Sequence, residues 1–286
     1  MSYLSRNTKT VIGMIHVQAL PGTPRCGQPL ESIVERARTE TRMYAEAGVD
    51  GVMIENMHDV PYLNGQVGPE ITAAMTATGF AVRAEWLKAR PEYRTPSSPD
   101  ERADLPLGVQ ILAAANREAL ATALACGASF IRAENFAYAH VADEGLMPTA
   151  EAGPLLRYRR QIGAEHIRIL ADVKKKHSSH ALTADISLDE AARAIEFFGA
   201  DGVVVTGAAT GTPASLEDAA TVRKAVDIPV AIGSGLTPKN LPGFWAHADI
   251  FIVGSYVKRG DVWSNEIDPE RLTQFMSVAH ALRDRA

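Results

Sequence analysis

The feature that most constrains the fold is a repeat of short apolar, β-branched runs, most of them followed by a segment with helical periodicity. This alternation is typical of a parallel sheet whose strands are joined by helices. The predicted strands cover residues 11–16, 51–55, 107–112, 130–134, 167–173, 202–206, 229–233 and 250–254. The predicted helices cover residues 31–47, 69–89, 117–126, 150–162, 188–198, 215–226, 238–246 and 269–285.

Eight strands alternating with eight helices predict an α/β fold, a single (βα)₈ barrel of the TIM type that spans residues 1–286 as one domain. The competing architecture is a doubly wound open sheet, which usually has about five or six strands, and no GxGxxG follows the first strand here. Gly48 and Gly199 each precede a strand in a Gly-x-Asp-Gly run, which predicts left-handed helix ends. The stretch 89–105, rich in proline, serine and charge, predicts a loop on the face away from the chemistry.

Composition limits the classes of partner. The net charge of −5 and the scattered basic residues give no support for binding to nucleic acid. No apolar run reaches the ~20 residues that a membrane-spanning helix needs, and no signal peptide is evident, so we expect a soluble, cytoplasmic protein without a transmembrane segment. Cys26 and Cys126 are far apart and lack metal-type spacing, which favours free thiols. Homo-oligomerisation stays open, because no interface can be recognised in the sequence.

Titratable residues gather at the ends of the early predicted strands. In a barrel of this kind the carboxyl ends of the strands meet at one mouth, so polar residues there are candidates for catalysis. Glu55 and Asp172 are the strongest acid/base candidates, because a carboxylate at the end of an apolar strand is costly to bury without a partner. The alternative is a structural ion pair with a residue such as Arg132. The candidate catalytic residues are His16, Glu55, Glu134, Asp172, Lys176 and His177.

Each of the remaining candidates has an alternative interpretation. Arg132 and Glu134 share strand parity, so they could neutralise each other inside the barrel. Lys176 beside His177 predicts a group that holds an anionic substrate and moves a proton, although lysines 174–176 could also be a solvated loop. His16 could be an ordinary core histidine. His16, Glu55, Glu134 and Asp172 are compatible with a divalent cation, but their spacing does not diagnose one, and the cofactor stays unknown.

The last three predicted strands end in glycine-containing loops. Glycine there lets backbone N–H groups approach an anion, and the loops after the seventh and eighth strands are the usual phosphate site of TIM barrels. A small phosphorylated molecule is therefore the expected ligand, with Lys258 as a further source of charge. The alternative is that these glycines only form tight turns. The candidate phosphate-binding residues are Thr206, Gly207, Gly233, Ser234, Gly235, Gly254 and Ser255.

Seven short segments together resemble the BtpA/SgcQ family, (βα)₈ proteins named for a photosystem I biogenesis factor. They are Gly13-Met-Ile-His16 with Leu20-Pro-Gly22, Glu55-Asn56 with Asp59 and Pro61, Phe130-Ile-Arg132, Leu170-Ala-Asp-Val173 with Lys176-His177, Val205-Thr-Gly207 with Thr210-Gly211, Gly233-Ser-Gly235, and Ile252-Val-Gly254 with Lys258. Residues 110–115 and Glu134-Asn135 depart from the family pattern, which implies different ligand contacts from the third and fourth strands. The family name implies a role in membrane-complex assembly for some members, and no transmembrane or strongly amphipathic segment here explains such a role.

Two functions follow as hypotheses. The first is an enzyme that acts on a small phosphorylated metabolite, such as a sugar phosphate, with acid/base chemistry at the barrel mouth. Isomerase, epimerase, lyase and hydrolase reactions all fit this description, and a Schiff base through Lys174 or Lys176 is also open. The second is a non-catalytic assembly or biogenesis factor that uses the outer surface of the barrel. The first is preferred, because surface binding alone would not require so many polar groups at one mouth.

Overall fold

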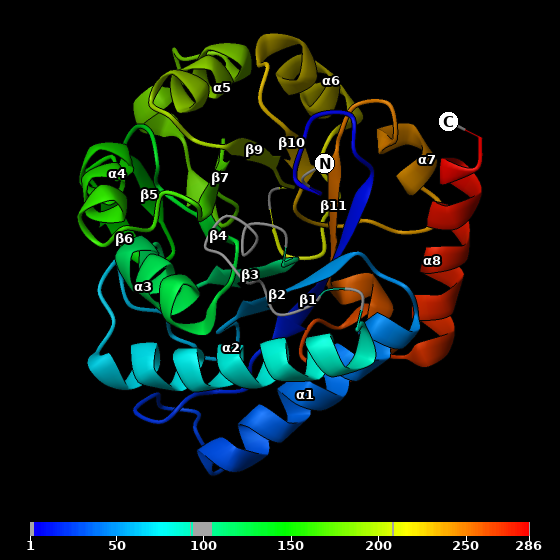
Figure 1. Ribbon diagram of the computed structural model, residues 1–286. Helices are drawn as coiled ribbons and strands as arrows, with labels where there is room; N and C mark the ends of the chain where they lie inside the picture. The colour runs from blue at the N-terminus through cyan, green and yellow to red at the C-terminus, as the bar shows by residue number, and fades with distance from the viewer. Residues whose placement is uncertain (1–2, 92, 94–104, 208, 286) are drawn as a thin grey trace.

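The computed structural model describes residues 3–91, 93, 105–207 and 209–285, and in them eight parallel strands close into a barrel. The order around the barrel is β1, β11, β10, β9, β7, β4, β3, β2 and back to β1 (Figure 1). Each predicted strand coincides with one of these to within a few residues, so the predicted barrel is confirmed. Their bounds are β1 Thr10–His16, β2 Gly51–Glu55, β3 Leu107–Gln110, β4 Phe130–Ala133, β7 Arg168–Asp172, β9 Gly202–Val205, β10 Val230–Ile232 and β11 Ile250–Val253.

Helices surround the barrel (Figure 1). They are α1 Leu30–Glu46, α2 Pro69–Ala89, α3 Asn116–Cys126, α4 Ala152–Gln161, α5 Leu188–Phe197, α6 Leu216–Ala225, α7 Leu241–Phe244 and α8 Pro269–Arg283, with short 3₁₀ helices η2 Ala181–Thr183, η3 Ser255–Val257 and η4 Arg259–Asp261. Local signals fix several ends. Ser187 and Glu190 form a capping box at the start of α5. Gly48 and Gly199 have φ of 79° and 87°, which confirms the predicted left-handed positions after α1 and α5.

Three regions differ from the sequence-based expectation or lie beyond it. A small sheet of β5 His140–Ala142, β6 Gly145–Met147 and β8 Ser178–Ser179 was not predicted, because strands of two or three residues are too short to show alternation. Helix α7 is shorter than expected, since reciprocal hydrogen bonds between Thr237 and Asn240 hold the preceding residues in a turn. The predicted loop at 89–105 falls mostly on residues 92 and 94–104, which lie outside the described residues.

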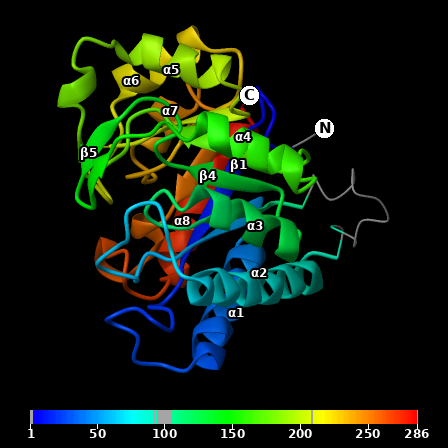
Figure 2. The same cartoon turned by 90° about the vertical axis from the view of Figure 1, so that its left-hand side faces the viewer.

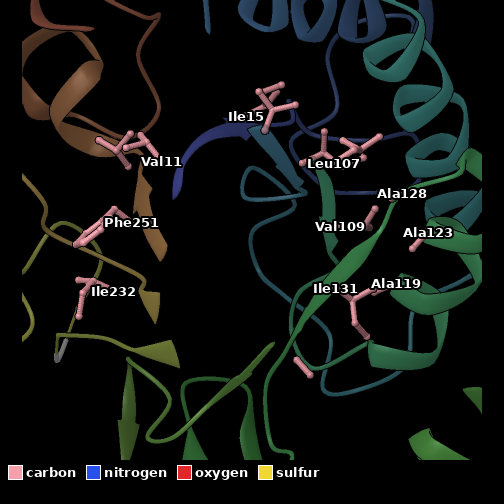
Figure 3. Packing of buried hydrophobic residues seen from close by; sticks show 14 of the residues in the cluster. Val11, Ile15, Leu107, Val109, Ala119, Ala123, Ala128, Ile131, Ile232 and Phe251 are labelled. Carbon is pink, nitrogen blue, oxygen red and sulfur yellow. The ribbon is translucent and has the colours of Figure 1, made fainter. Parts of the chain in front are cut away.

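The alternation of side chains along the strands creates two apolar cores. Outward side chains such as Val11, Ile131 and Phe251 pack between the sheet and the helices, where Ala119 and Ala123 of α3 contribute small side chains (Figure 3). The second core fills the inside of the barrel; it contains Leu4, Ile12, Met14, Met53, Phe130, Leu170, Val204, Ala231, Ile250 and Ile252. The barrel is therefore a packed core and not a pore.

The two ends of the barrel differ. Figure 2 shows β5 at one end and the N-terminus toward the other. The inner apolar core includes Leu4 from the N-terminal segment, which therefore lies at the amino ends of the strands. The opposite end, at the carboxyl ends of the strands, is where the inward positions become polar. No helix of the described residues has the length and apolar character needed to cross a bilayer.

Candidate functional site

A ring of polar side chains lies above the inner apolar core. On β1, β2, β4 and β7 the inward apolar residue is followed two positions later by a polar one on the same face of the strand. The strand register places His16 beside Glu55, and Glu55 beside Gln110 of β3. The inward polar residues are His16, Glu55, Gln110, Arg132 and Asp172, and each is at most 6% exposed. The predicted gathering of polar groups at the mouth thus has a geometric cause in strand parity.

Asp172 is held by Arg132 of the neighbouring strand. The guanidinium donates through Nε to Oδ1 at 2.7 Å and through Nη2 to Oδ2 at 2.9 Å, and both side chains are at most 1% exposed. Burial opposes the charge on Arg132, but Asp172 raises its pKa above the usual range. A buried bidentate pair fixes both groups in place. The structural alternative considered for Asp172 is therefore present, and Arg132 has this carboxylate, not that of Glu134, as its hydrogen-bonded partner.

His16 is a neutral imidazole at this depth. Its Nδ1 lies 2.8 Å from the carbonyl oxygen of Trp263, and because a carbonyl only accepts, Nδ1 carries the proton. Burial, and then the charge of Lys258, keep the pKa of His16 well below its usual value. Its Nε2 faces Glu55 Oε2 at 3.7 Å, too far for a hydrogen bond. Glu55 Oε1 is buried and accepts no hydrogen bond from the described residues.

Glu134 follows β4 and combines firm positioning with a raised pKa. Asn116 fixes its backbone by donating from Nδ2 to the Glu134 carbonyl at 2.8 Å, and the Ala114 N–H donates to Oε2 at 3.1 Å. Burial raises the pKa of Glu134 to about 7, against the lowering effect of Lys175. A carboxyl group with this pKa exchanges its proton near neutral pH.

A pocket of about 450 Å³ opens beside Glu134. A volume of this size is typical of small-molecule sites. Apolar and charged groups share its surface, since Leu112 and Tyr62 line it together with Glu134 and Lys176. The full lining is Met57, Val60, Pro61, Tyr62, Leu112, Glu134, Asp143, Glu144, Lys175, Lys176, His177, Thr210 and Trp263. Three of the predicted catalytic residues, Glu134, Lys176 and His177, are therefore brought together in one pocket.

The small sheet positions the basic residues of this pocket. The Asp143 N–H donates to the His177 carbonyl at 3.2 Å, which joins the β5–β6 turn to the loop after β7. Lys175 Nζ then lies 3.0 Å from Glu144 Oε2 and 3.9 Å from Glu134 Oε2. Although burial opposes its charge, these two carboxylates raise the pKa of Lys175. Lys176 is also buried, and its ammonium group has no hydrogen bond or ion pair with the described residues.

His177 connects the pocket to the loop after β9. The Thr210 N–H donates to Nε2 at 3.0 Å, so Nε2 is an acceptor and the proton of the neutral ring lies on Nδ1, 3.7 Å from Asp143 Oδ2. Burial and the charge of Lys176 lower the pKa of His177. This histidine therefore holds Thr210 against the pocket as a neutral ring.

The predicted phosphate loops pack tightly against each other. The Ser234 hydroxyl accepts from the Gly207 N–H and donates to the Thr212 carbonyl, both at 2.9 Å. A side chain at Gly207 would collide with the backbone at Thr212, and one at Gly235, where φ is 66°, would collide with the backbone of Pro213. Glycine at these two positions thus has a packing role, and the Ser234 hydroxyl is engaged within the protein.

Two further glycines make room for the charged residues. A Cβ at Gly233 would lie 3.2 Å from Arg132 Nη2, and one at Gly254 would lie 3.2 Å from His16 Cε1. Residues of the early and late strands therefore meet at the same mouth of the barrel. None of the described groups accepts a hydrogen bond from the backbone N–H of Gly235 or Ser255. Thr206 donates its hydroxyl to the Lys174 carbonyl at 3.1 Å.

The expectation that Lys258 adds charge to the phosphate loops needs correction, and the cofactor stays unassigned. Lys258 is 1% exposed and forms an ion pair of 2.6 Å with Glu40 of α1, so it supplies no charge to the rim of the late loops. Among the described residues, no group of three His, Cys, Asp or Glu side chains is arranged to hold a metal ion. The divalent cation considered from the sequence thus has no recognisable site in this part of the chain.

Tyr62, Glu144 and Trp263 are among the pocket residues that sequence reasoning did not single out. Glu144 lies in the unpredicted β5–β6 turn, and Trp263 follows η4 in the long connection from β11 to α8. The Tyr62 hydroxyl donates to the Met57 carbonyl at 2.7 Å. No sequence signal marks Glu144, because it lies 31 residues before its partner Lys175 and meets it only in the folded chain.

Comparison with known proteins adds relatives along the whole chain. The model described as the BtpA family matches residues 7–86 and 98–281. An uncharacterized mitochondrial protein of Caenorhabditis elegans is 46% identical over 98% of this chain and 96% of its own length. The photosystem I biogenesis protein BtpA of Synechocystis is 34% identical over 96% of this chain and 90% of its own length.

Solved structures show the same fold at low identity. The (S)-3-O-geranylgeranylglyceryl phosphate synthase of Thermoplasma acidophilum, in complex with sn-glycerol-1-phosphate, has a TM-score of 0.55 at 18% identity and covers 96% of this chain and 94% of its own. The thiamine phosphate pyrophosphorylase of Pyrococcus furiosus has a TM-score of 0.54 at 16% identity, with 98% of each chain covered. At this identity the likeness shows a common barrel and nothing further.

Proposed function

For this chain, which belongs to the BtpA family, we propose an enzymatic function: acid/base chemistry on a small phosphorylated molecule at the carboxyl ends of the barrel strands. The observation that carries the proposal is the placement of Glu134 in the 450 Å³ pocket with Lys176. A carboxyl group with a pKa of about 7 is suited to accept and return a proton at neutral pH.

The residues take distinct roles in this proposal. Glu134 moves a proton to and from the reacting atoms, and the hydrogen bond from Ala114 keeps its carboxyl oriented. Lys176 stabilises negative charge that develops on a substrate oxygen. His16, Glu55 and the Arg132–Asp172 pair form the floor under these groups, with the positions of Arg132 and Asp172 fixed by two hydrogen bonds.

In this proposal the phosphate group of the ligand binds at the late loops. The N–H groups of Gly235 and Ser255 have no acceptor among the described residues, and backbone donors of this kind suit a phosphate oxygen. Thr210 connects these loops to the pocket through its contact with His177. The reacting part of the ligand would then lie over Glu134 while its phosphate lies toward η3.

Phosphate recognition is tested by thermal unfolding. We expect inorganic phosphate and sugar phosphates to raise the Tm and the corresponding free sugars to leave it unchanged. Ser255→Glu places a negative charge where the phosphate binds and should abolish the effect. Ser277→Glu, on the exposed face of α8, is the matched control and should retain it. Equal responses to phosphorylated and free sugars would contradict this part of the proposal.

Acid/base catalysis is tested by exchange of carbon-bound hydrogen. Phosphorylated aldoses and ketoses are incubated in D₂O with the protein, and loss of the proton signal next to the carbonyl is followed by NMR. We expect exchange with the wild-type protein and none with Glu134→Gln, whereas the exposed control Glu165→Gln should behave like the wild type. Exchange that persists in Glu134→Gln would remove this residue from the mechanism.

The second hypothesis, a surface assembly role, has one observation in its favour. Phe197 and Phe198 at the end of α5 are 85% and 50% exposed. Such an apolar patch is typical of a contact surface. The two functions are separable, because a surface role predicts that Glu134→Gln leaves cellular function intact while Phe197→Ser abolishes it.

A further inference from the structure

Three lysines of the described chain are less than one-tenth exposed, and they differ in their partners. Lys175 has Glu144 at 3.0 Å, and Lys258 has Glu40 at 2.6 Å. Lys176 is 8% exposed, and its ammonium group has no carboxylate, carbonyl or hydroxyl partner among the described residues. Nζ of Lys176 is not among the fully covered polar atoms that lack a partner, so it reaches solvent and is free to meet a ligand in the pocket that it lines.

Lys176 shares a pocket with a carboxyl group that can transfer protons. It lines the 450 Å³ pocket together with Glu134, which supplies a carboxyl group for proton transfer. Leu112 and Trp263 give the same pocket apolar surface, against which the carbon atoms of a small substrate can pack. His16 and His177 both have lowered pKa values to which the charge of Lys176 contributes, after burial, and this places the amine close to both rings.

We propose that Lys176 forms a Schiff base with the carbonyl group of a phosphorylated aldehyde or ketone. This inference rests on the proposed function, and it names the substrate class and the covalent step of that same site. Lys175 and Lys258 are excluded from the role, because each is bound to a carboxylate. The phosphate of the substrate binds at the late loops, which places its carbonyl carbon toward the pocket.

The step balances with Glu134 as the only proton carrier. The carboxylate of Glu134 takes a proton from the Lys176 ammonium, and the free amine adds to the carbonyl carbon. A C–N bond forms, and the π electron pair of the carbonyl goes to oxygen, which takes the proton from Glu134. The Glu134 carboxylate then takes a proton from the new ammonium nitrogen. Glu134 returns its proton to the hydroxyl group, which leaves as water. The product is a protonated imine on Lys176, and no oxidant or reductant is consumed.

Reductive trapping tests this proposal on the full chain. The protein is mixed with dihydroxyacetone phosphate or glycolaldehyde phosphate and sodium borohydride, and the intact mass and peptide masses are measured. We expect a mass increase equal to the probe less one oxygen atom, located on the peptide that contains Lys176. The remaining lysines report the uncatalysed reaction in the same sample. Dihydroxyacetone without phosphate should label Lys176 at least tenfold more slowly.

Three variants give the test its controls. Lys176→Met and Lys176→Arg should not be labelled, while Lys174→Met, two residues away, should be labelled like the wild type. Lys176→Arg keeps the positive charge but cannot form an imine, so it should retain a Tm increase with inorganic phosphate. Thermal unfolding of each variant shows that it is folded.

The outcomes separate the two proposals. A Tm increase with phosphate but no label on Lys176 overturns the Schiff base and leaves phosphate recognition standing. A label on Lys176 at the same rate with and without the phosphate group retains the nucleophile and overturns phosphate recognition. A label on Lys174 or Lys175 instead of Lys176 overturns the assignment of the residue. Absence of both label and Tm increase overturns both proposals.

Discussion

The mouth of the barrel has two halves that are built by opposite means. The charged half, formed by His16, Glu55, Arg132, Glu134 and Asp172, places ionisable side chains inward, and two of them, Arg132 and Asp172, satisfy each other. The glycine half, formed by residues 206–207, 233–235 and 254–255, has few side chains, and its shape comes from backbone packing. Residues of the glycine half make the space that Arg132 and His16 occupy. The comparison shows that the charged half depends on the pairing of ionisable side chains, whereas the glycine half depends on close backbone packing. Different substitutions should therefore disrupt the two halves.

The largest effect should come from breaking the buried pair of the charged half. Arg132→Met leaves Asp172 as a buried carboxylate without its two donors, which should destabilise the fold by about 3–5 kcal/mol. Urea unfolding measures the loss. Arg160→Met is the matched control, because the pair of Arg160 with Glu165 is exposed, and it should change stability little. Similar losses in the two variants would show that Asp172 does not depend on Arg132.

An added methyl group in the glycine half should lower the stability of the fold. Gly235→Ala places a Cβ against the Pro213 backbone at a φ of 66°, so strain and overlap add to about 2–4 kcal/mol. Gly163→Ala separates the two causes, because Gly163 has a φ of 68° and open space around it. It should therefore show only the strain, about 1–2 kcal/mol. Equal losses in urea unfolding would mean that the two late loops yield to each other and are not rigidly packed.

A pH dependence distinguishes the charged half from the glycine half. The folded-state pKa of Glu134 is raised from 4.5 to about 7, so the folded protein binds this proton more tightly than the unfolded chain. The associated stability, up to about 3 kcal/mol, is complete below pH 4.5 and is lost as the pH rises to about 7. Glu134→Gln should remove this part of the pH profile. A carboxyl-carbon NMR titration of Glu134 with a midpoint near 4.5 would contradict the prediction.

The sequence predicts the barrel and the positions of the polar ring for simple reasons. Strands rich in β-branched residues, such as β9 Gly202–Val205, have a period that shows directly in the residues. Strand parity then decides which side chains face inward, and His16, Glu55 and Asp172 all follow that rule. The left-handed positions after α1 and α5 are equally predictable from their two glycines, because few other residues adopt this φ.

The partners within the ring could not be predicted in the same way. Arg132 lies beside Leu170, so the residue it reaches on β7 is Asp172, one pleat further on; this depends on the stagger between β4 and β7. Sequence parity left Glu134 as an equally good partner. The carbonyl of Trp263 is another case, since its place over His16 depends on the path of a long loop. Contacts of this kind arise from the three-dimensional register, which the order of residues alone does not specify.

The smallest expected effect is the difference in stability between variants of two adjacent lysines in the pocket. Lys175→Met leaves Glu134 and Glu144 without their shared cation, and we expect a loss of about 1–3 kcal/mol in urea unfolding. Lys176→Met removes an ammonium group that has no partner among the described residues, and stability should stay the same or rise slightly. The two side chains are similarly buried, at 7% and 8% exposure, so the difference isolates pairing from burial. Equal losses would mean that Lys176 has a structural partner after all, and its role as a free nucleophile would fall with that result.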